Sequence, residues 1–347
     1  MAVYTHVSAE AMGDLLLHYD VGTLVSAKGI AEGVENSNYL IETTKSRFIL
    51  TLYEKRVDVS DLPFFTSLLD HLADRGCSVP RLIKGRDTRQ VREVCGRPAA
   101  LIEFLSGVSV SHPTPAQARA TGTALGQMHT ALADFPLNRT NSLGLEGWLA
   151  LADKCGDDLD QITPGLKARV AEECAFQSAN WPTDLPHAVI HADLFPDNVL
   201  MRGDAVSGLI DFYFACTDVR AWDVAVTHTS WCFDNEGRNY NAALGEALIA
   251  GYDETFGLSD AERAAFNILA RGSCLRFLLT RAWDWLNTPA DALVTRKDPL
   301  AFLRRLEHYA GLSIGDRHQP TPPPDLPDSV PYGKSGGGVG RNRDQTQ

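Results

Sequence analysis

The sequence changes character near Gly107, and this change constrains the fold more than any other feature. Before Gly107, runs rich in β-branched and aromatic residues are separated by turn residues, a pattern typical of β-strands. Such runs cover residues 22–28, 38–43, 47–53 and 97–104. Apolar residues recur at helical spacing over 60–75, which predicts a helix packed on the sheet. The first part is therefore predicted to be a small antiparallel sheet with one helix.

Helical patterns dominate after Gly107. Thr114 and Pro115 supply a cap residue and a favoured first helical residue, and an alanine- and leucine-rich run continues to Leu132. Ser259 and Glu262 have the spacing of a capping box. Further helices are predicted over 163–179, 220–231, 240–254 and 260–287, and only residues 187–211 have strand character. The pattern predicts an α+β fold of two lobes, the second larger and mainly helical.

The two lobes and a tail divide the chain. We expect an N-terminal lobe over 1–105 and a helical C-terminal lobe over 106–314. Residues 315–347 hold a proline run, three consecutive glycines and a polar end, so they lack the apolar groups that offset the entropy of ordering. This tail is predicted to be disordered.

Composition narrows the functional classes. The chain has 347 residues, long enough for a large core, and a formal net charge of -12, which disfavours a nucleic-acid-binding surface. No signal peptide or membrane span is visible, so a cytoplasmic location is expected. The seven cysteines form no C-x-x-C pair, which argues against a disulfide framework and a zinc site. The oligomeric state stays open.

The segment from His191 to Asn198 carries the strongest chemical pattern. Phosphoryl transfer to an alcohol needs a carboxylate beside the hydroxyl and oxygen ligands that hold Mg²⁺ against the phosphates of ATP. Asp193 and Asn198 have the H-x-D-x-x-x-x-N spacing in which the aspartate is the base and the asparagine a metal ligand. Asp211 ends the next apolar strand, where a second metal ligand is expected.

Other interpretations of this segment remain. Asp193, Asn198 and the intervening Pro196 are also ordinary turn residues. His191, Asp193 and Asp211 together suggest ligands of a hydrolytic metal centre, although that centre leaves Asn198 without a role. We expect His191 to support the loop through hydrogen bonds.

A glycine-containing turn at residues 29–38 suits the phosphates of a nucleotide. Its candidate binding residues are Gly33, Asn36, Ser37 and Asn38. Thr51 aligns where protein kinases have a lysine, so another cation is needed, and Lys55 and Arg56 are candidates, although both also suit the surface. The backbone of Glu103 and Leu105, at the expected lobe boundary, is the candidate adenine site. The lobe over 1–105 is therefore the expected nucleotide-binding lobe, and that over 106–314 the expected catalytic and substrate lobe.

These motifs resemble those of the aminoglycoside phosphotransferase and choline kinase superfamily, whose fold is like that of protein kinases. The stretches 35–39, 51–54, 191–200, 208–216, 276–281 and 284–289 are similar to the homoserine kinases of this superfamily. The resemblance implies ATP-dependent phosphorylation of the side-chain hydroxyl of L-homoserine, a step of threonine biosynthesis. It also implies that Thr51 in place of lysine is a family feature.

A zwitterionic substrate needs a cation for its carboxylate and an anion or carbonyls for its ammonium group. Arg281, Asp284 and Trp285 share one helical face and are candidates, but the same spacing also gives an ordinary helix ion pair. Tyr213, Asp234 and Arg276 are further candidates, and Asp223 is expected to brace the catalytic loop.

Two alternative functions stay open at this point. A kinase of the same superfamily acting on choline, a sugar or an aminoglycoside would share the catalytic residues, although the arginines at 271, 276 and 281 favour an anionic group. A nucleotide-binding module without activity is suggested by Thr51, and the intact Asp193, Asn198 and Asp211 argue against it.

Overall fold

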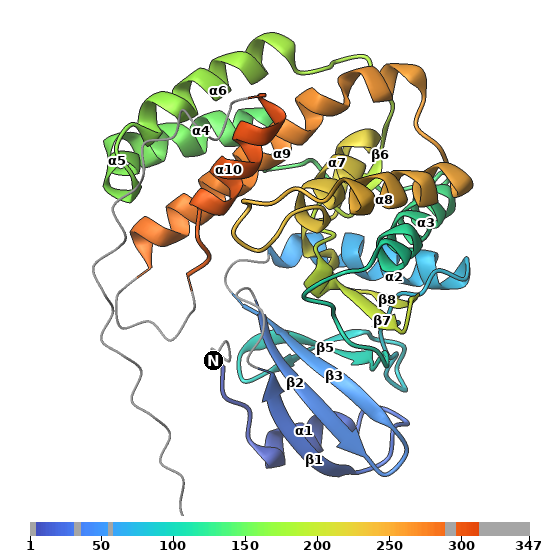
Figure 1. Ribbon diagram of the computed structural model, residues 1–347. Helices are drawn as coiled ribbons and strands as arrows, with labels where there is room; N and C mark the ends of the chain where they lie inside the picture. Colours follow the sequence, from blue (N-terminus) through green and yellow to red (C-terminus); the bar gives the residue numbers. More distant parts are fainter. Residues whose placement is uncertain (1–4, 31–35, 55–57, 289–295, 312–347) are drawn as a thin grey trace, which may run out of the picture. The chain divides into compact units, whose positions relative to one another are not determined.

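The computed structural model describes residues 5–30, 36–54, 58–288 and 296–311 (Figure 1). The described residues up to Gly311 belong to one compact unit. The predicted tail over 315–347 and the candidate residues Gly33, Lys55 and Arg56 lie outside the described residues. The division at residues 105 and 106 stays a prediction.

The first lobe contains the predicted antiparallel sheet. Its strands are β1 (Leu24–Ile30), β2 (Asn36–Thr43), β3 (Arg47–Tyr53), β4 (Val91–Val94) and β5 (Arg97–Glu103). They lie in the order β1-β2-β3-β5-β4, and each neighbouring pair is antiparallel. The β2–β3 register places Asn38 opposite Thr51. Two of the predicted nucleotide-binding residues are therefore cross-strand neighbours.

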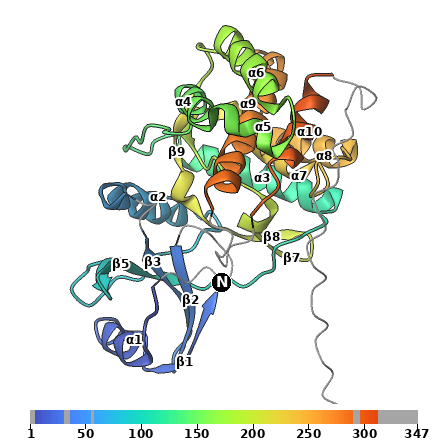
Figure 2. The ribbon, with the colours of Figure 1, turned by 90° about the vertical axis from the view of Figure 1, so that its left-hand side faces the viewer.

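Strand β3 is almost wholly apolar because both faces of the sheet are covered. Leu50 and Leu52 pack in a core with α1 (Ala9–Leu16), which begins at the capping residue Ser8. Tyr53 faces the other way and packs in the core that includes α2 (Leu62–Asp74). Figure 2 shows α1 and α2 on opposite sides of the sheet. Helix α1 was not predicted, whereas α2 confirms the predicted helix over 60–75.

The second lobe is mainly helical, as predicted. Its helices are α3 (Pro115–Ala131), α4 (Leu145–Cys155), α5 (Leu159–Ile162), α6 (Leu166–Asn180), α7 (Arg220–Trp231), α8 (Ala242–Thr255), α9 (Asp260–Asn287) and α10 (Leu300–Tyr309). Helices α3 and α9 begin at capping boxes headed by Thr114 and Ser259. Helices α4, α5 and α10 were not predicted. None of the helices in the described part of the chain is long and apolar enough to cross a membrane.

Four short strands interrupt the helices and position the candidate site. β6 (His187–Ile190) pairs with β9 (Cys216–Val219), and β7 (Val199–Arg202) pairs with β8 (Ala205–Leu209), both antiparallel. The segment 191–198 therefore joins two different small sheets. Because both of its ends are anchored in strands, its backbone is constrained from either side.

Helices α3 and α8 approach each other closely at glycines. A Cβ atom on Gly122 of α3 would collide with the carbonyl oxygen of Leu248, and one on Gly251 of α8 would collide with the carbonyl oxygen of Arg119. The two backbones are thus in direct contact, which only glycine permits at these positions.

We expect Gly122→Ala to lower the free energy of unfolding by about 1–3 kcal/mol, because the methyl group forces α3 and α8 apart. The matched control is Gly13→Ala in α1, where an added Cβ meets nothing within 4 Å. That change should stabilise the protein by about 0.5–1 kcal/mol through helix propensity. Urea denaturation of both variants tests the contrast, and equal shifts would contradict the close contact.

Candidate active site

Asp193 and Asn198 contact each other within the loop that follows β6. The side-chain amide nitrogen of Asn198 donates to the backbone carbonyl of Asp193 at 2.8 Å and to its carboxylate at 3.2 Å. The amide oxygen of Asn198 accepts no hydrogen bond from the described residues. This orientation suits a metal ligand, because an oxygen atom is left for the cation.

Asp211 lies beside this pair. The amide of Ile210 donates to the backbone carbonyl of Asn198 at 3.0 Å, which brings the end of β8 to the loop. Asp211 has a left-handed backbone with φ of 66° and an exposed side chain. Left-handed residues other than glycine are uncommon and concentrate at functional sites.

The environment of Asp193 makes its carboxylate a stronger base than an ordinary aspartate. Burial raises its pKa to about 8, the charge of Arg276 opposes this shift, and the charges of Asp211 and Asp197 add to it. A carboxylate with a raised pKa accepts a proton more readily.

His191 is tied down through both ring nitrogens. Its Nε2 donates to the carbonyl of Ile210 at 3.0 Å, and its Nδ1 accepts from the amide of Asp193 at 3.3 Å. Only the neutral ring with its proton on Nε2 fits both partners. Burial also lowers the pKa of His191, which favours the same neutral form. These bonds leave no lone pair for a metal, which argues against the hydrolytic metal centre.

The carboxylate of Asp223, at the start of α7, is fully buried and receives three donors. It accepts from the amide of His191 at 2.7 Å, the amide of Ala192 at 2.8 Å and Nε2 of His129 at 3.1 Å. Burial alone would raise the pKa of Asp223. The hydrogen bond and charge of His129, together with the charge and backbone amide of His191, outweigh burial and lower this pKa below its ordinary value. The hydroxyl of Tyr252 in turn contacts Nδ1 of His129 at 2.9 Å. Asp223 therefore holds the loop after β6 by the backbone of His191 and Ala192.

Arg276 of α9 forms a hydrogen bond with the backbone of the same loop. Its guanidinium donates to the carbonyl oxygen of Ala192, while the amide of Ala192 donates to Asp223. Ala192 has a left-handed φ of 63°, a conformation that costs energy for a residue with a Cβ. The two charged partners hold it there. Arg276 is only 2 % exposed, so the structure places this predicted substrate residue against the loop backbone.

The predicted nucleotide-binding residues of β2 and β3 form side-chain hydrogen bonds, either with each other or with Glu54. The Thr51 hydroxyl donates to the Asn38 side chain at 2.7 Å. The Ser37 hydroxyl donates to the carboxylate of Glu54 at 2.7 Å, and the Asn36 side chain accepts from the Glu54 amide at 3.3 Å. Glu54 also forms an ion pair with Arg97 at 3.3 Å. These hydrogen bonds join the start of β2 to the end of β3 and to Glu54.

The backbone amides of the two candidate adenine-site residues, Glu103 and Leu105, differ in their hydrogen bonding. The amide of Glu103 donates to the carbonyl of Arg81 at 2.8 Å. The amide of Leu105 donates to no acceptor in the described part of the chain. The backbone amide of Leu105, two residues after the end of β5, therefore has no acceptor among the described residues at the predicted adenine site.

The predicted substrate residues occupy several environments. The guanidinium of Arg281 lies 4.5 Å from the ring centroid of Phe302 and donates to the carbonyl of Asp298 at 3.2 Å. Trp285 is 38 % exposed, with Arg296 over its ring. Asp284, on the same helix, is half-buried.

Two further candidates lie elsewhere. Tyr213 packs edge-on against Tyr53 and Phe65, at the first lobe's sheet and α2. The carboxylate of Asp234 accepts from the amides of Arg238 and Asn239, so it shapes its own turn.

Sequence reasoning missed His129, Tyr252 and Glu54. His129 and Asp223 are 94 residues apart, and His129 and Tyr252 are 123 apart, so no local pattern connects them. Glu54 stands in the segment similar to homoserine kinases, and that resemblance was the one available signal.

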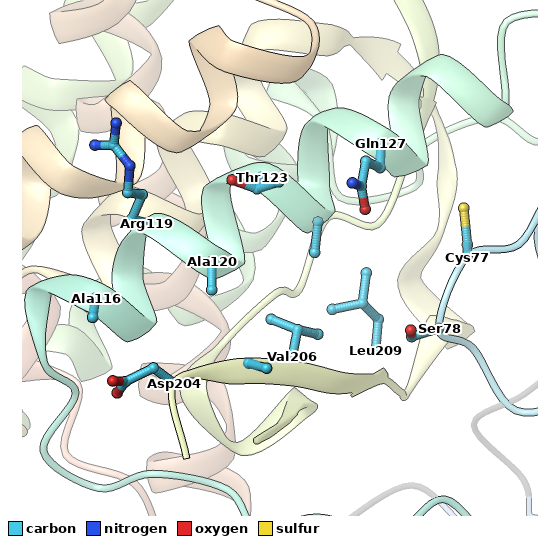
Figure 3. Close-up of a pocket in the computed structure, with 12 residues that line it drawn as sticks. Cys77, Ser78, Ala116, Arg119, Ala120, Thr123, Gln127, Asp204, Val206 and Leu209 are labelled. Atoms are coloured by element: carbon cyan, nitrogen blue, oxygen red, sulfur yellow. The ribbon is translucent and has the colours of Figure 1, made fainter. Parts of the chain in front are cut away.

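A cavity of about 420 Å³ lies apart from the catalytic loop. Figure 3 shows it between α3 and β8, with Cys77 and Ser78 at one end. Neither Asp193, Asn198 nor Asp211 lines it. It is therefore not the candidate active site.

We expect Asp223→Asn to lower the free energy of unfolding by about 2–4 kcal/mol, because one oxygen acceptor is replaced by an amino group that faces buried donors. Asp14→Asn on the exposed surface of α1 is the control and should change stability little. Thermal and urea unfolding measure both. A neutral result at position 223 would show that the three hydrogen bonds do not hold the loop.

The chain is similar to known phosphotransferases along most of its length. A model of the phosphotransferase enzyme family matches residues 26–259. A homoserine kinase from Zymomonas mobilis is 55% identical over 316 residues, which is 90% of this chain and 98% of that protein. A homoserine kinase from Azorhizobium caulinodans is 52% identical over 313 residues, covering 90% of this chain and 97% of its own.

Solved structures share the fold at low sequence identity. An amicoumacin kinase in complex with AMP-PNP and Ca²⁺ matches with a TM-score of 0.69 and 14% identity, over 88% of this chain and 94% of the other. A microcompartment-associated aminopropanol kinase matches with a TM-score of 0.57 and 19% identity, over 88% and 95% of the two chains. With its full-length relatives and its kinase-like two-lobed fold, the chain belongs to the phosphotransferase enzyme family, in the group of the homoserine kinases.

Proposed function

We propose that the protein transfers the γ-phosphate of ATP to the side-chain hydroxyl of L-homoserine, giving O-phospho-L-homoserine. The observation that carries this proposal is the identity of 50% or more to homoserine kinases along nearly their whole length. The H-x-D-x-x-x-x-N loop and Asp211 are the matching chemical parts. The product lies on the route to threonine, and a cytoplasmic location is part of the proposal.

In this proposal Asp193 is the base that accepts the hydroxyl proton of the substrate. Its half-buried position and raised pKa support that role. The amide oxygen of Asn198, which accepts no hydrogen bond from the described residues, and the exposed carboxylate of Asp211 are oxygen ligands of the kind that Mg²⁺ prefers. When bound, Mg²⁺ neutralises phosphate charge during transfer.

His191, Asp223 and Arg276 are proposed as positioning residues. All three bond to the backbone of the loop, so they fix where the Asp193 carboxylate points. On the nucleotide side, the Leu105 amide and the Glu103 carbonyl are proposed to bind adenine. Asn36, Ser37, Asn38 and Thr51 are proposed to shape the phosphate-binding turn, and Gly33 to belong to it. Asp284 and Trp285 are proposed to contact the substrate amine.

We expect Asp193→Asn to reduce kcat by at least about 10³-fold, because the amide cannot accept the hydroxyl proton. Binding of Mg²⁺ and ATP should persist, since the metal ligands are separate residues. ADP release and calorimetric titration measure the two properties. Asp204→Asn in the exposed turn between β7 and β8 is the control. Substantial residual turnover would rule Asp193 out as the base.

A substrate panel tests the reaction itself. We expect kcat/KM for L-homoserine to exceed that for choline, simple sugars and aminoglycosides by at least about 10³-fold, the scale reached by sites that hydrogen-bond a substrate's polar groups. Coupled ADP-release assays with phosphoamino-acid detection give the answer. A preference for another alcohol would replace the substrate assignment, and no turnover of any alcohol would favour the non-catalytic nucleotide-binding module.

A further inference from the structure

Two arginines converge on one aromatic ring near the catalytic loop. Arg281 of α9 lies 4.5 Å from the ring centroid of Phe302, and Arg305 of α10 lies 4.3 Å from the same centroid. Helices α9 and α10 pack side by side (Figure 1). Two like charges are therefore held close together, an arrangement that costs free energy unless an anion is present.

Neither guanidinium has a carboxylate partner within salt-bridge distance in the described part of the chain. Arg281 donates to the carbonyl of Asp298 at 3.2 Å, and Arg305 to the carbonyl of Asp234 at 2.9 Å. Arg305 is only 4 % exposed, and its Nε donates to no acceptor among the described residues. Buried charges are normally paired. The pair is thus short of negative charge.

The pair lies close to the candidate base through a chain of ring contacts. Phe195, two residues after Asp193, has its ring centroid 6.0 Å from that of Phe302 and 4.8 Å from that of Phe277. The negative charges of Asp193 and Asp197 act on Arg281, while burial and the neighbouring Arg305 lower its pKa to about 10. Arg281 is half-buried, so a ligand can reach it.

We propose that Arg281 binds the α-carboxylate of the amino-alcohol substrate, with Arg305 as the second positive charge that stabilises the bound anion. This inference rests on the proposed function. A guanidinium suits a carboxylate because its planar donors match two oxygens. Both residues come from the helical lobe, whereas the candidate adenine site follows β5 of the first lobe, so the substrate is a better occupant than the nucleotide phosphates.

The test compares two substrates that differ only in the carboxylate, L-homoserine and 3-aminopropan-1-ol. We expect Arg281→Gln to lower kcat/KM for homoserine by about 30- to 100-fold, mainly through KM, since a charge-assisted hydrogen-bonded pair is lost. Turnover of 3-aminopropan-1-ol and the KM for ATP should stay within about 3-fold, because neither uses the lost contact. Arg305→Gln should show the same selectivity more weakly. Arg263→Gln, an exposed α9 arginine paired with Asp253, is the matched control.

Two further measurements keep the test decisive if 3-aminopropan-1-ol is turned over too slowly to measure or if Arg281→Gln folds poorly. The inhibition constant of L-2-aminobutyrate, which has the carboxylate but no hydroxyl, should rise by the same factor in Arg281→Gln. Arg281→Lys retains the charge and should give a smaller, homoserine-specific loss at an unchanged Tm. Equal losses for both substrates, or a raised KM for ATP instead, would overturn the inference. Absence of homoserine turnover in the unmodified protein would instead overturn the proposed function.

Discussion

The buried carboxylate of Asp223 fixes the loop that carries the candidate site, residues 191–198, to the helical lobe. Burying an isolated carboxylate costs several kcal/mol, so the site is stable only because two loop amides and His129 all donate to it. One of those amides belongs to Ala192, whose left-handed backbone is held on its carbonyl side by Arg276. The Asp223 carboxylate of α7 thus fixes the backbone directly before Asp193, and with it the position of the Asp193 Cα atom.

The elements that the sequence predicted well are those with local signals. Strand β3 has the predicted bounds, α3 begins at the predicted cap residue Thr114, and α9 begins at the predicted capping box of Ser259. Helix α7 also has its predicted bounds, although it is buried along its length. Helices α1, α4, α5 and α10 were missed because helices this short are stabilised mainly by packing against the rest of the protein, which no local pattern reveals.

The candidate site divides in the same way. Asp193, Asn198 and Asp211 follow from spacing, and the structure brings their segments together. His129 and Arg305 come from helices distant in sequence, and no local pattern marks them. Asp234 is a candidate on its charge alone, and its carboxylate oxygens accept hydrogen bonds from Arg238 and Asn239 within its own turn, contacts that the sequence pattern does not specify.

The first lobe gives its sheet an internal polar network. Thr51 of β3 bonds to Asn38 of β2, and Glu54, just after β3, bonds to Ser37 of β2 and pairs with Arg97 of β5. A threonine at position 51 also means that β3 offers no primary amine there. Acylating or aldehyde-bearing ATP analogues that modify the β3 lysine of protein kinases would have no target at this position. Chemical profiling by such reagents would therefore overlook this strand even in a fully active protein.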